Sequence, residues 1–338
     1  MQQQDADTAK VTLAQMAELA GVSISTVSKV LNGRDDVSEN TRSRVETLLE
    51  LHGYRNTRRK MTDAPLIEIV FHELESLWAM ELIKGVETIA KANHASIVLT
   101  ESGTRHSPGP DWLPGVLRRR PLGVILVFSS LPAEIKQQLQ ARSIPFVVID
   151  PAGDPEPDVP SVGSANWAGG LAATRHLIEL GHRRIAIITG PLDMLCSNAR
   201  LDGFRTAMTM ADLPVDPSMI TCGDFHVSGG YENALRLLYQ EDRPTAIFAS
   251  SDIQALGVFE AARVMGLRVP HDLSVVGYDD LSIARWSSPA LTTVHQPLRQ
   301  MAESATQILL DLRDGRTDTP RLELATSLVV RKSTAALA

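Results

Sequence analysis

Apolar residues in the first sixty positions recur with a helical period, in three short runs. The first run follows Thr12, a residue type that caps helix N-termini, and stops at Gly21, where the missing Cβ permits a sharp turn. Ser23 is a suitable cap for a second helix, and residues 38–53 predict a third one that begins at a serine. The pattern predicts one small domain of three helices. Its expected core positions are Leu13, Met16, Ala17, Ala20, Val27, Val30, Leu31, Val45, Leu48, Leu49 and Leu51.

The outward face of the second predicted helix is small and polar, with one basic residue late in the helix. Such a face packs poorly against protein but suits base edges and phosphates in a DNA major groove. A helical hairpin that only packs is the alternative interpretation. The arrangement of helix, glycine turn and helix therefore favours a DNA-binding segment. The outward residues are Ile24, Ser25, Ser28 and Lys29.

From Leu66 onward the pattern changes to short apolar runs that alternate with amphipathic helices, which is typical of parallel βα units. The rhythm restarts after the proline-rich stretch PAGDPEPDVP. The sequence therefore predicts an α/β fold with two doubly wound lobes. The expected lobes are residues 66–162 plus 293–320, and residues 163–292 plus 321–331.

Ligands of open parallel sheets bind beyond the carboxyl ends of the strands, so two such lobes predict a cleft between them. The loops expected there combine aromatic rings with carboxylates and a guanidinium, a mixture that suits a polyhydroxylated ligand. Each residue also has a structural alternative, because an aspartate after a strand is often a helix cap and an aromatic residue can be core. The candidate effector-binding residues are Trp78, Phe128, Ser129, Asp150, Arg200, Phe225, Asp252 and Asp279.

The composition is that of an ordinary globular protein, with 338 residues, 43% of them hydrophobic and 22% charged. Residues 1–60 hold nine Lys and Arg against eight acids, so residues 61–338 carry −8 while the whole chain carries −7. Six of those bases lie between Arg42 and Lys60, opposed there by two acids. Basic character is therefore local, as expected where only one part of a protein meets phosphate.

Several function classes lack their signatures. The chain contains no GxxxxGK[ST], GxSxG or HExxH motif and no GxGxxG after its first strand, and its nine histidines are scattered. Cys196 and Cys222 are expected to be free thiols. Neither a secretory leader nor a membrane span is recognisable. We expect no enzyme activity, cofactor or metal, no membrane association, and a cytoplasmic location.

The motifs together resemble the lactose repressor and galactose repressor family of bacterial transcription factors over essentially the whole chain. The resemblance rests on VTLAQMAELAGVSISTVSKVLNG, VSENTRSRVETLLELHGY, ELGHRRIAIITGP, ARLDGF, AIFASSDIQALGVFEAARVMGLRVPHDLSVVGYDD and PALTTVHQP. It implies a homodimer or tetramer that reads a palindromic double-stranded DNA operator, and an effector domain with the fold of a periplasmic sugar-binding protein. Residues 1–55 would be the DNA-binding domain, 56–65 a linker, and 66–338 the effector domain.

The resemblance also implies roles for single residues. Ile24, Ser25 and Lys29 align with base-contacting positions of the family. Its phosphate contacts and caps align with Thr12, Ser23, Thr26, Asn32 and Ser38. Arg200 and Asp279 match positions that grip sugar hydroxyls or purine edges. Phe225 matches the position of a stacking aromatic, and Trp78 matches a contact from the first lobe. Asp150 matches an acidic contact at the lobe crossover.

The linker departs from the family pattern. The run YRNTRRKMTDAPLIEIV is about one helical turn shorter than usual and lacks the leucine that wedges into the minor groove. Met61 could act as the wedge, whereas Arg58, Arg59 and Lys60 favour an arm that follows phosphates or a narrow minor groove. A plain solvated linker is the remaining alternative.

The expected function is that of a sugar-responsive repressor of a sugar-utilisation operon, released by its effector. Two segments are similar to regulators of xylan and xylo-oligosaccharide use, namely LIEIVFHELESLWAMELIKGVE and SVGSANWAGGLAATRHLIELGHRRIAIITGPLDMLCSNARLDGF. Xylose or a xylo-oligosaccharide is therefore the expected effector. A purine is less expected, because Met194 and Cys196 replace polar groups near Arg200. A solute-binding protein without a role in transcription is the alternative, but it leaves the first sixty residues unexplained.

Overall fold

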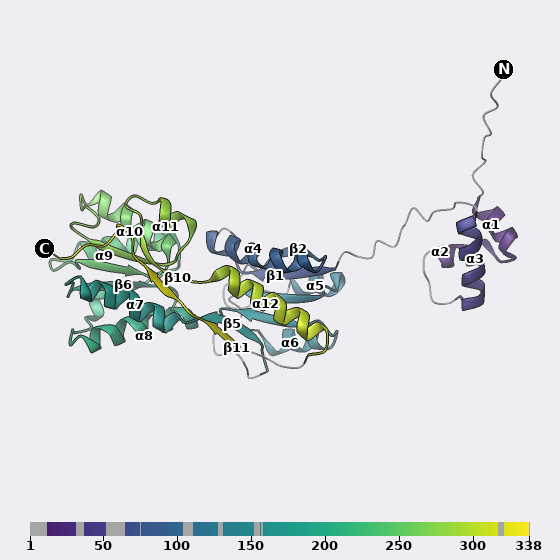
Figure 1. Cartoon of the computed structure of the whole chain (residues 1–338), viewed down its shortest axis with the longest axis horizontal. Coiled ribbons are helices and arrows are strands. Elements are labelled where there is room, and N and C mark those ends of the chain that lie inside the picture. The colour runs from purple at the N-terminus through teal and green to yellow at the C-terminus, as the bar shows by residue number, and fades with distance from the viewer. Residues whose placement is uncertain are drawn as a thin grey trace, which may run out of the picture. The chain divides into compact units, whose positions relative to one another are not determined.

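The computed structural model divides into two compact units, Met1–Ala64 and Pro65–Ala338 (Figure 1). It describes residues 12–31, 37–51, 65–74, 76–103, 111–127, 131–151, 156, 158–316 and 321–337. Several residues singled out in the sequence lie outside these ranges, and nothing is concluded about their structure. They are Asn32, Arg58, Arg59, Lys60, Met61, Phe128 and Ser129.

The first unit consists of the three expected helices, α1 (Leu13–Ala20), α2 (Ile24–Leu31) and α3 (Glu39–Leu51). Thr12 caps α1 in a capping box with Gln15, whose side-chain oxygen accepts from the Thr12 amide at 2.8 Å. Gly21 ends the helix at φ +62°. Met16, Ala17, Ala20, Val27, Val30, Val45 and Leu49 form the buried core. Leu51 was expected in this core and is 77% exposed instead, because α3 ends at this residue.

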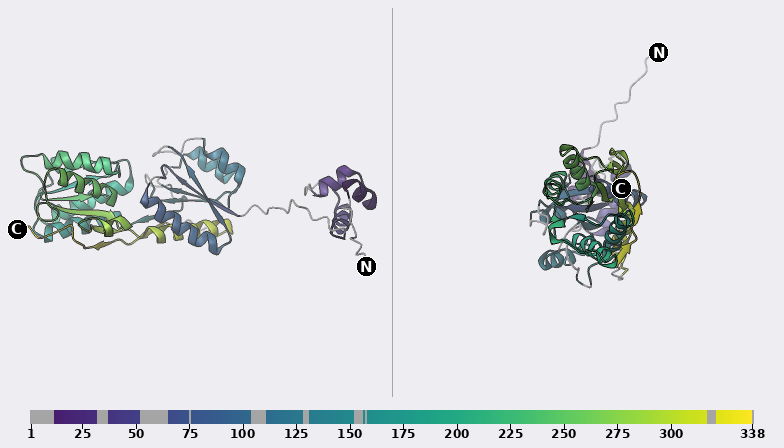
Figure 2. Two further views of the ribbon diagram at one scale, coloured as in Figure 1. Left: turned by 90° about the horizontal axis from the view of Figure 1, so that it is seen from above. Right: turned by 90° about the vertical axis from the view of Figure 1, so that its left-hand side faces the viewer.

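The second unit contains two six-stranded sheets, each with helices on both faces (Figure 2). This arrangement confirms the expected α/β fold with two doubly wound lobes. The elements up to the first crossover are β1 (Leu66–Phe71), α4 (Leu77–Ala92), β2 (Ser96–Glu101), α5 (Leu113–Arg119), β3 (Gly123–Val127), α6 (Ala133–Gln140), β4 (Phe146–Ile149) and β5 (Ser161–Ser164). Those that follow are α7 (Asn166–Glu179), β6 (Ile185–Thr189), α8 (Leu195–Met210), a 3-10 turn (Pro217–Met219), β7 (Ile220–Cys222), α9 (Val227–Leu238), β8 (Ala246–Ala249), α10 (Asp252–Val264), β9 (Ser274–Asp279), α11 (Ser282–Trp286), β10 (Thr292–His295), α12 (Leu298–Arg313), β11 (Arg321–Leu324) and β12 (Ser327–Val329).

The first lobe is built on a parallel sheet with strand order β11-β5-β4-β3-β1-β2. Its central strands β1, β3 and β4 are almost wholly apolar and buried, as expected when both faces are covered. Helices α4 and α12 pack on one face, and α5 and α6 pack on the other. The second lobe has the order β12-β10-β9-β8-β6-β7, in which β12 alone of the described strands runs antiparallel. Helices α9 and α10 cover one of its faces, and α7 and α8 the other.

Within the described ranges, the chain passes between the lobes after β5, after β10 and after β11 (Figure 1). The second and third crossings differ from the expected boundaries. Residues 293–295 were assigned to the first lobe, but β10 pairs with β9 and β12 in the second. Residues 321–324 were assigned to the second lobe, but β11 pairs with β5 in the first, with Arg321 opposite Ser161. Strand pairing decides these positions, and a short strand has the same hydrophobic pattern in either sheet.

In the part of the chain that the structure describes, no helix combines the length and the apolar character needed to cross a membrane. Both cysteines are free thiols, Cys196 buried and Cys222 exposed.

Candidate functional site

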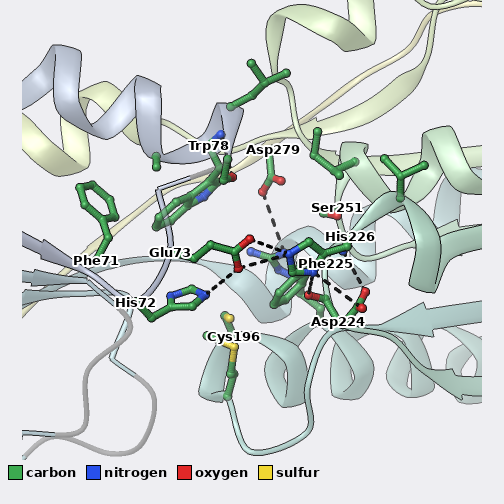
Figure 3. Close-up of a pocket in the computed structure, with 17 residues that line it drawn as sticks. Phe71, His72, Glu73, Trp78, Cys196, Asp224, Phe225, His226, Ser251 and Asp279 are labelled. Carbon is green, nitrogen blue, oxygen red and sulfur yellow. Dashed lines mark hydrogen bonds and ion pairs between the residues drawn. The ribbon is translucent and has the colours of Figure 1, made fainter. Parts of the chain in front are cut away.

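A cavity of about 270 Å³ lies between the two lobes, at the carboxyl ends of their strands (Figure 3). Parallel strands of both sheets end here, so the loops that follow β1, β7 and β9 converge on one space. The lining residues from the first lobe are Phe71, His72, Glu73, Ser76, Leu77, Trp78 and Ala79. Those from the second lobe are Met194, Cys196, Arg200, Asp224, Phe225, His226, Val227, Ser251, Ile253 and Asp279.

Arg200 of α8 is the fixed cation of this cavity, and only 3% of its surface is exposed. Its Nε donates to Asn166 Oδ1 at 2.8 Å, and its Nη1 donates to the Ser250 carbonyl oxygen at 2.5 Å. The guanidinium also lies 3.7 Å from the centre of the Tyr278 ring, a cation–π contact. These contacts fix the plane of the guanidinium from three sides.

Two buried carboxylates accompany the guanidinium. Asp279 Oδ1 is 4.0 Å from Arg200 Nη1. Asp150 accepts a hydrogen bond from Gln296 at 3.0 Å, and Gln296 in turn accepts one from Arg200 at 3.4 Å. Burial raises the pKa of Asp279 to about 7, although Arg200 acts in the opposite sense, and burial raises the pKa of Asp150 as well. The site therefore holds polar groups that have lost their water and can be hydrogen-bonded by a ligand.

The backbone is strained where these residues sit. Asp150, Phe225 and Asp279 have φ values of +46°, +68° and +108°, in a region that side chains other than glycine rarely adopt. Such strain persists only where the surrounding structure imposes it, and it concentrates at functional sites. The strained backbone is consistent with a site that requires these three side chains to point in particular directions.

Two aromatic rings form apolar walls of the cavity. The Phe225 ring packs over Gly190, where an added Cβ would come within 2.0 Å of Phe225 Cζ, so only glycine leaves room for it. Trp78 lies in the first turn of α4, which Ser76 caps by accepting from the Trp78 amide at 3.2 Å. Trp78 is 8% exposed. One ring comes from each lobe, so a ligand between them would contact both.

A charged contact crosses the cleft between Glu73 of the first lobe and His226 of the second (Figure 3). His226 Nε2 is 3.1 Å from Glu73 Oε1, and its Nδ1 is 2.9 Å from the Asp224 carbonyl oxygen. Both partners are acceptors, so both ring nitrogens carry a proton when both bonds are made. The hydrogen bond to Glu73 accordingly raises the pKa of His226. The contact links the lobes in the form seen here.

Four of the candidate effector residues line the cavity together: Trp78, Arg200, Phe225 and Asp279. Asp150 lies behind them and connects to Arg200 through Gln296. Asp252 does not line the cavity. Its carboxylate accepts from the Leu281 amide at 2.7 Å and from the Thr293 hydroxyl at 2.5 Å. Asp252 is the first residue of α10, so these two hydrogen bonds connect the start of α10 to the loop after β9 and to β10.

Glu73, His226 and Gln296 are site residues that the sequence pattern did not predict. Glu73 and His226 are 153 residues apart, and each is an ordinary surface residue type, so nothing local marks them as partners. A usable signal was the position of His72 and Glu73 directly after β1, at the same sheet edge as the other candidates.

The candidate DNA-reading surface lies on the exposed side of α2. Val27 and Val30 face the core, whereas Ile24 is 53% exposed and Ser25 and Lys29 are also exposed. Ser28 is half-buried. Thr26 and Ser25 are both hydrogen-bonded to the Ser23 hydroxyl, at 2.8 and 2.7 Å, which orients the first turn of the helix.

Comparison with known proteins connects both sites to one family. Residues 12–56 match the model of bacterial regulatory proteins of the lacI family, and residues 174–334 match a periplasmic binding protein-like domain. The HTH-type transcriptional repressor PurR of Proteus mirabilis (strain HI4320) is 35% identical over 330 residues, covering 96% of this chain and 97% of that repressor. The chain belongs to the LacI family. This LacI-family chain is a DNA-binding transcriptional repressor with a ligand-binding domain.

Solved structures of the same family share the fold. The transcriptional regulator CelR in complex with cellobiose is 35% identical, with a TM-score of 0.73, and the match covers 95% of this chain and 99% of the CelR chain. The lac repressor dimer bound to operator and an anti-inducer is 29% identical, with a TM-score of 0.71, and the match covers 96% of this chain and 99% of the lac repressor chain. These relatives are transcriptional regulators, and none of the three is named for xylan or a xylo-oligosaccharide.

Proposed function

We propose that this LacI-family repressor binds a mono- or disaccharide between its lobes and thereby changes its affinity for a palindromic operator. The observation that carries the proposal is the cleft cavity, in which buried polar groups face two aromatic walls. Its volume of about 270 Å³ lies just below the usual range of ligand pockets, roughly 300–1,000 Å³. That volume favours a short saccharide over a long oligosaccharide.

A sugar matches the chemistry of the cavity. The CH faces of a pyranose ring can pack on Phe225 or Trp78, while its hydroxyls donate to the Asp279 carboxylate and accept from Arg200. Because these polar groups are already buried, a hydroxyl that satisfies them adds affinity, and an analogue without it leaves them unpaired. CelR, which is similar over nearly the whole chain, was solved with cellobiose.

A purine is the second candidate, because several of the relatives are named PurR. Purine recognition requires polar partners for the ring nitrogens and exocyclic groups. Beside Arg200 the cavity wall is instead formed by Met194 and Cys196, which are 2% and 4% exposed. Burial raises the pKa of the Cys196 thiol to about 12, so it stays protonated and apolar in character. The wall therefore favours the sugar.

The coupling between sugar and DNA requires two half-sites at a fixed spacing. A dimer would place two α2 helices in successive major grooves, and a change in lobe closure would alter the distance between them. The lac repressor dimer was solved on its operator, which supports this assembly for the present chain. Thermodynamic linkage then requires that DNA change the affinity for the sugar by the same factor.

A solute-binding role would account for the second unit alone. It leaves the exposed face of α2 and the match of residues 12–56 without a purpose. The repressor proposal uses both units, and its DNA contacts are Thr12, Ser23, Ile24, Ser25, Thr26, Ser28 and Lys29 among the described residues.

A thermal-shift screen of the full chain against xylose, xylobiose, cellobiose, ribose, hypoxanthine and guanine tests the effector class. A ligand that binds the folded state alone raises the melting temperature with its concentration. We expect a sugar to do so, and Phe225→Ala to weaken its binding by at least about tenfold through lost stacking and burial. Tyr239→Ala, an exposed aromatic of the same lobe, is the matched control and should bind normally. A shift with a purine alone would contradict the sugar assignment.

A further inference from the structure

Arginines gather along the edge of the first lobe that lies opposite the cleft. All strands of this sheet are parallel, so they all begin at one edge, as the pairs Ile67–Gly123 and Val124–Phe146 show. We name it the tether edge, because the chain from the helix-turn-helix unit enters the second unit here, at Pro65. The arginines that precede or begin its strands, or end α12, are Arg118, Arg119, Arg120, Arg142, Arg313, Arg316 and Arg321.

Much of the acidic charge at this edge already has a basic partner. Arg313 pairs with Asp314, and Arg316 pairs with Asp311, each at 2.8 Å. Arg119 pairs with the buried carboxylate of Glu68. In the loop before β5, Glu156 and Asp158 share Lys136.

Arg118, Arg120 and Arg142 remain as exposed positive charges. No ion pair with an acid is found for them among the described residues, and all three are solvent-exposed. Arg142 Nη1 donates to the Gln138 carbonyl oxygen at 3.2 Å, a neutral acceptor that leaves its charge uncompensated. Residues 61–338 as a whole are acidic, so this excess of positive charge is local and runs against the composition of the unit.

We propose that Arg118, Arg120 and Arg142 form a second DNA-contacting surface, which binds backbone phosphates beside the site read by α2. This inference rests on the proposed operator binding. The loop that carries Arg118 and Arg120 is joined directly to the start of β1, because the Leu122 amide donates to the Leu66 carbonyl oxygen at 2.6 Å. The surface is therefore on the side of the unit to which the DNA-binding helices are tethered.

The tether itself supports a polyanionic partner. Its sequence contains Arg58, Arg59 and Lys60, and the tether edge has the same sign of charge. Duplex DNA offers a phosphate roughly every 1.7 Å of helix axis and is already the ligand of the first unit. Arginine is also suited to bidentate phosphate contacts.

The test compares the triple variant R118Q/R120Q/R142Q with the matched variant R183Q/R205Q/R236Q, in the full chain. The control removes the same charge from exposed arginines of the second lobe. Fluorescein-labelled random-sequence duplexes of 14 and 40 base pairs are titrated by anisotropy from 50 to 300 mM KCl. Thermal melts of each variant confirm that it folds. Random sequence isolates phosphate contacts, because no base is selected.

On the 40-base-pair duplex we expect the tether-edge variant to lower the slope of log K against log salt by about two to three units per chain, near 0.9 for each phosphate that is no longer neutralised. Its affinity should fall more than tenfold at 100 mM KCl, while the control stays close to wild type. The decrease should be smaller on the 14-base-pair duplex, which offers fewer flanking phosphates. Equal slopes for the two folded variants would overturn the proposal. Absence of binding of the wild-type chain to both random duplexes would also overturn the proposal, whereas operator binding itself is tested separately on the selected operator.

Discussion

Replacing Arg200 by methionine should destabilise the protein in a way that depends on pH. The guanidinium is the cation nearest to the buried carboxylates Asp150 and Asp279, and it is 3% exposed. Removing one partner from a buried ionic network costs about 3–5 kcal/mol, because the remaining charge loses its compensation without regaining water. Methionine keeps much of the volume, so the cavity contribution stays small.

The pH dependence follows from the carboxylates. Burial already raises the pKa of Asp279 and Asp150, and replacing Arg200 removes the strongest interaction that opposes that rise in each. A buried acid whose folded pKa lies above its unfolded value binds a proton more tightly in the folded state, so stability falls as pH rises from the unfolded toward the folded pKa. We therefore expect a loss of about 3–5 kcal/mol at pH 8 and a clearly smaller loss at pH 5.5.

Urea denaturation at both pH values measures the effect, with Arg205→Met as the control. Arg205 is an exposed residue of the same helix, and its replacement should cost less than about 0.5 kcal/mol. Adding Asp279→Asn to the Arg200 variant should restore part of the stability at pH 8, since it removes one uncompensated charge. An equal loss at pH 5.5 and pH 8, with no recovery in the double variant, would refute the assignment of Arg200 as the counter-charge.

Three further changes test other parts of the structure. The hydrogen bond to Glu73 raises the pKa of His226. The contact therefore stabilises the protein fully below the unfolded pKa of about 6.5, and this stabilisation is lost as the pH rises through the folded pKa. The melting temperature of the wild type should therefore fall relative to that of Glu73→Gln between pH 6 and pH 8, and parallel curves would exclude the contact as the cause. Gly203→Ala should cost about 1–3 kcal/mol in urea denaturation, because its Cβ would lie 2.2 Å from the backbone carbonyl oxygen of Trp167; a loss below about 0.5 kcal/mol would show that α7 and α8 can separate easily. Lys29→Ala should weaken binding to the selected operator by about 1–3 kcal/mol if it reads a guanine, and an equal loss on random DNA would contradict base reading.

The sequence predicted the features that local chemistry decides. Thr12 and Gly21 mark both ends of α1 because capping and a left-handed turn each require particular residue types. The alternation of apolar runs with amphipathic helices predicted both lobes. Helix α5 has no comparable signal in the sequence, because it is short and contains Pro114 and Gly115.

The parts that sequence could not supply depend on contacts between distant segments. The pairing of β11 with β5 and the contact between Glu73 and His226 join residues more than 150 positions apart. Asp252 shows that a position directly after a strand does not by itself decide the role of a side chain. An aspartate after a strand can face a ligand or fix a neighbouring loop, and here its two hydrogen bonds to Leu281 and Thr293 place it in the second role.

The affinity of the full chain for DNA, measured with and without its sugar, decides whether the two sites are coupled. A duplex selected by the protein from a random pool serves as the operator, and calorimetry identifies a sugar that binds. Coupling predicts that a saturating concentration of that sugar changes the operator Kd by about five- to 150-fold, the usual range for two linked sites. An unchanged Kd in the presence of bound sugar would contradict it.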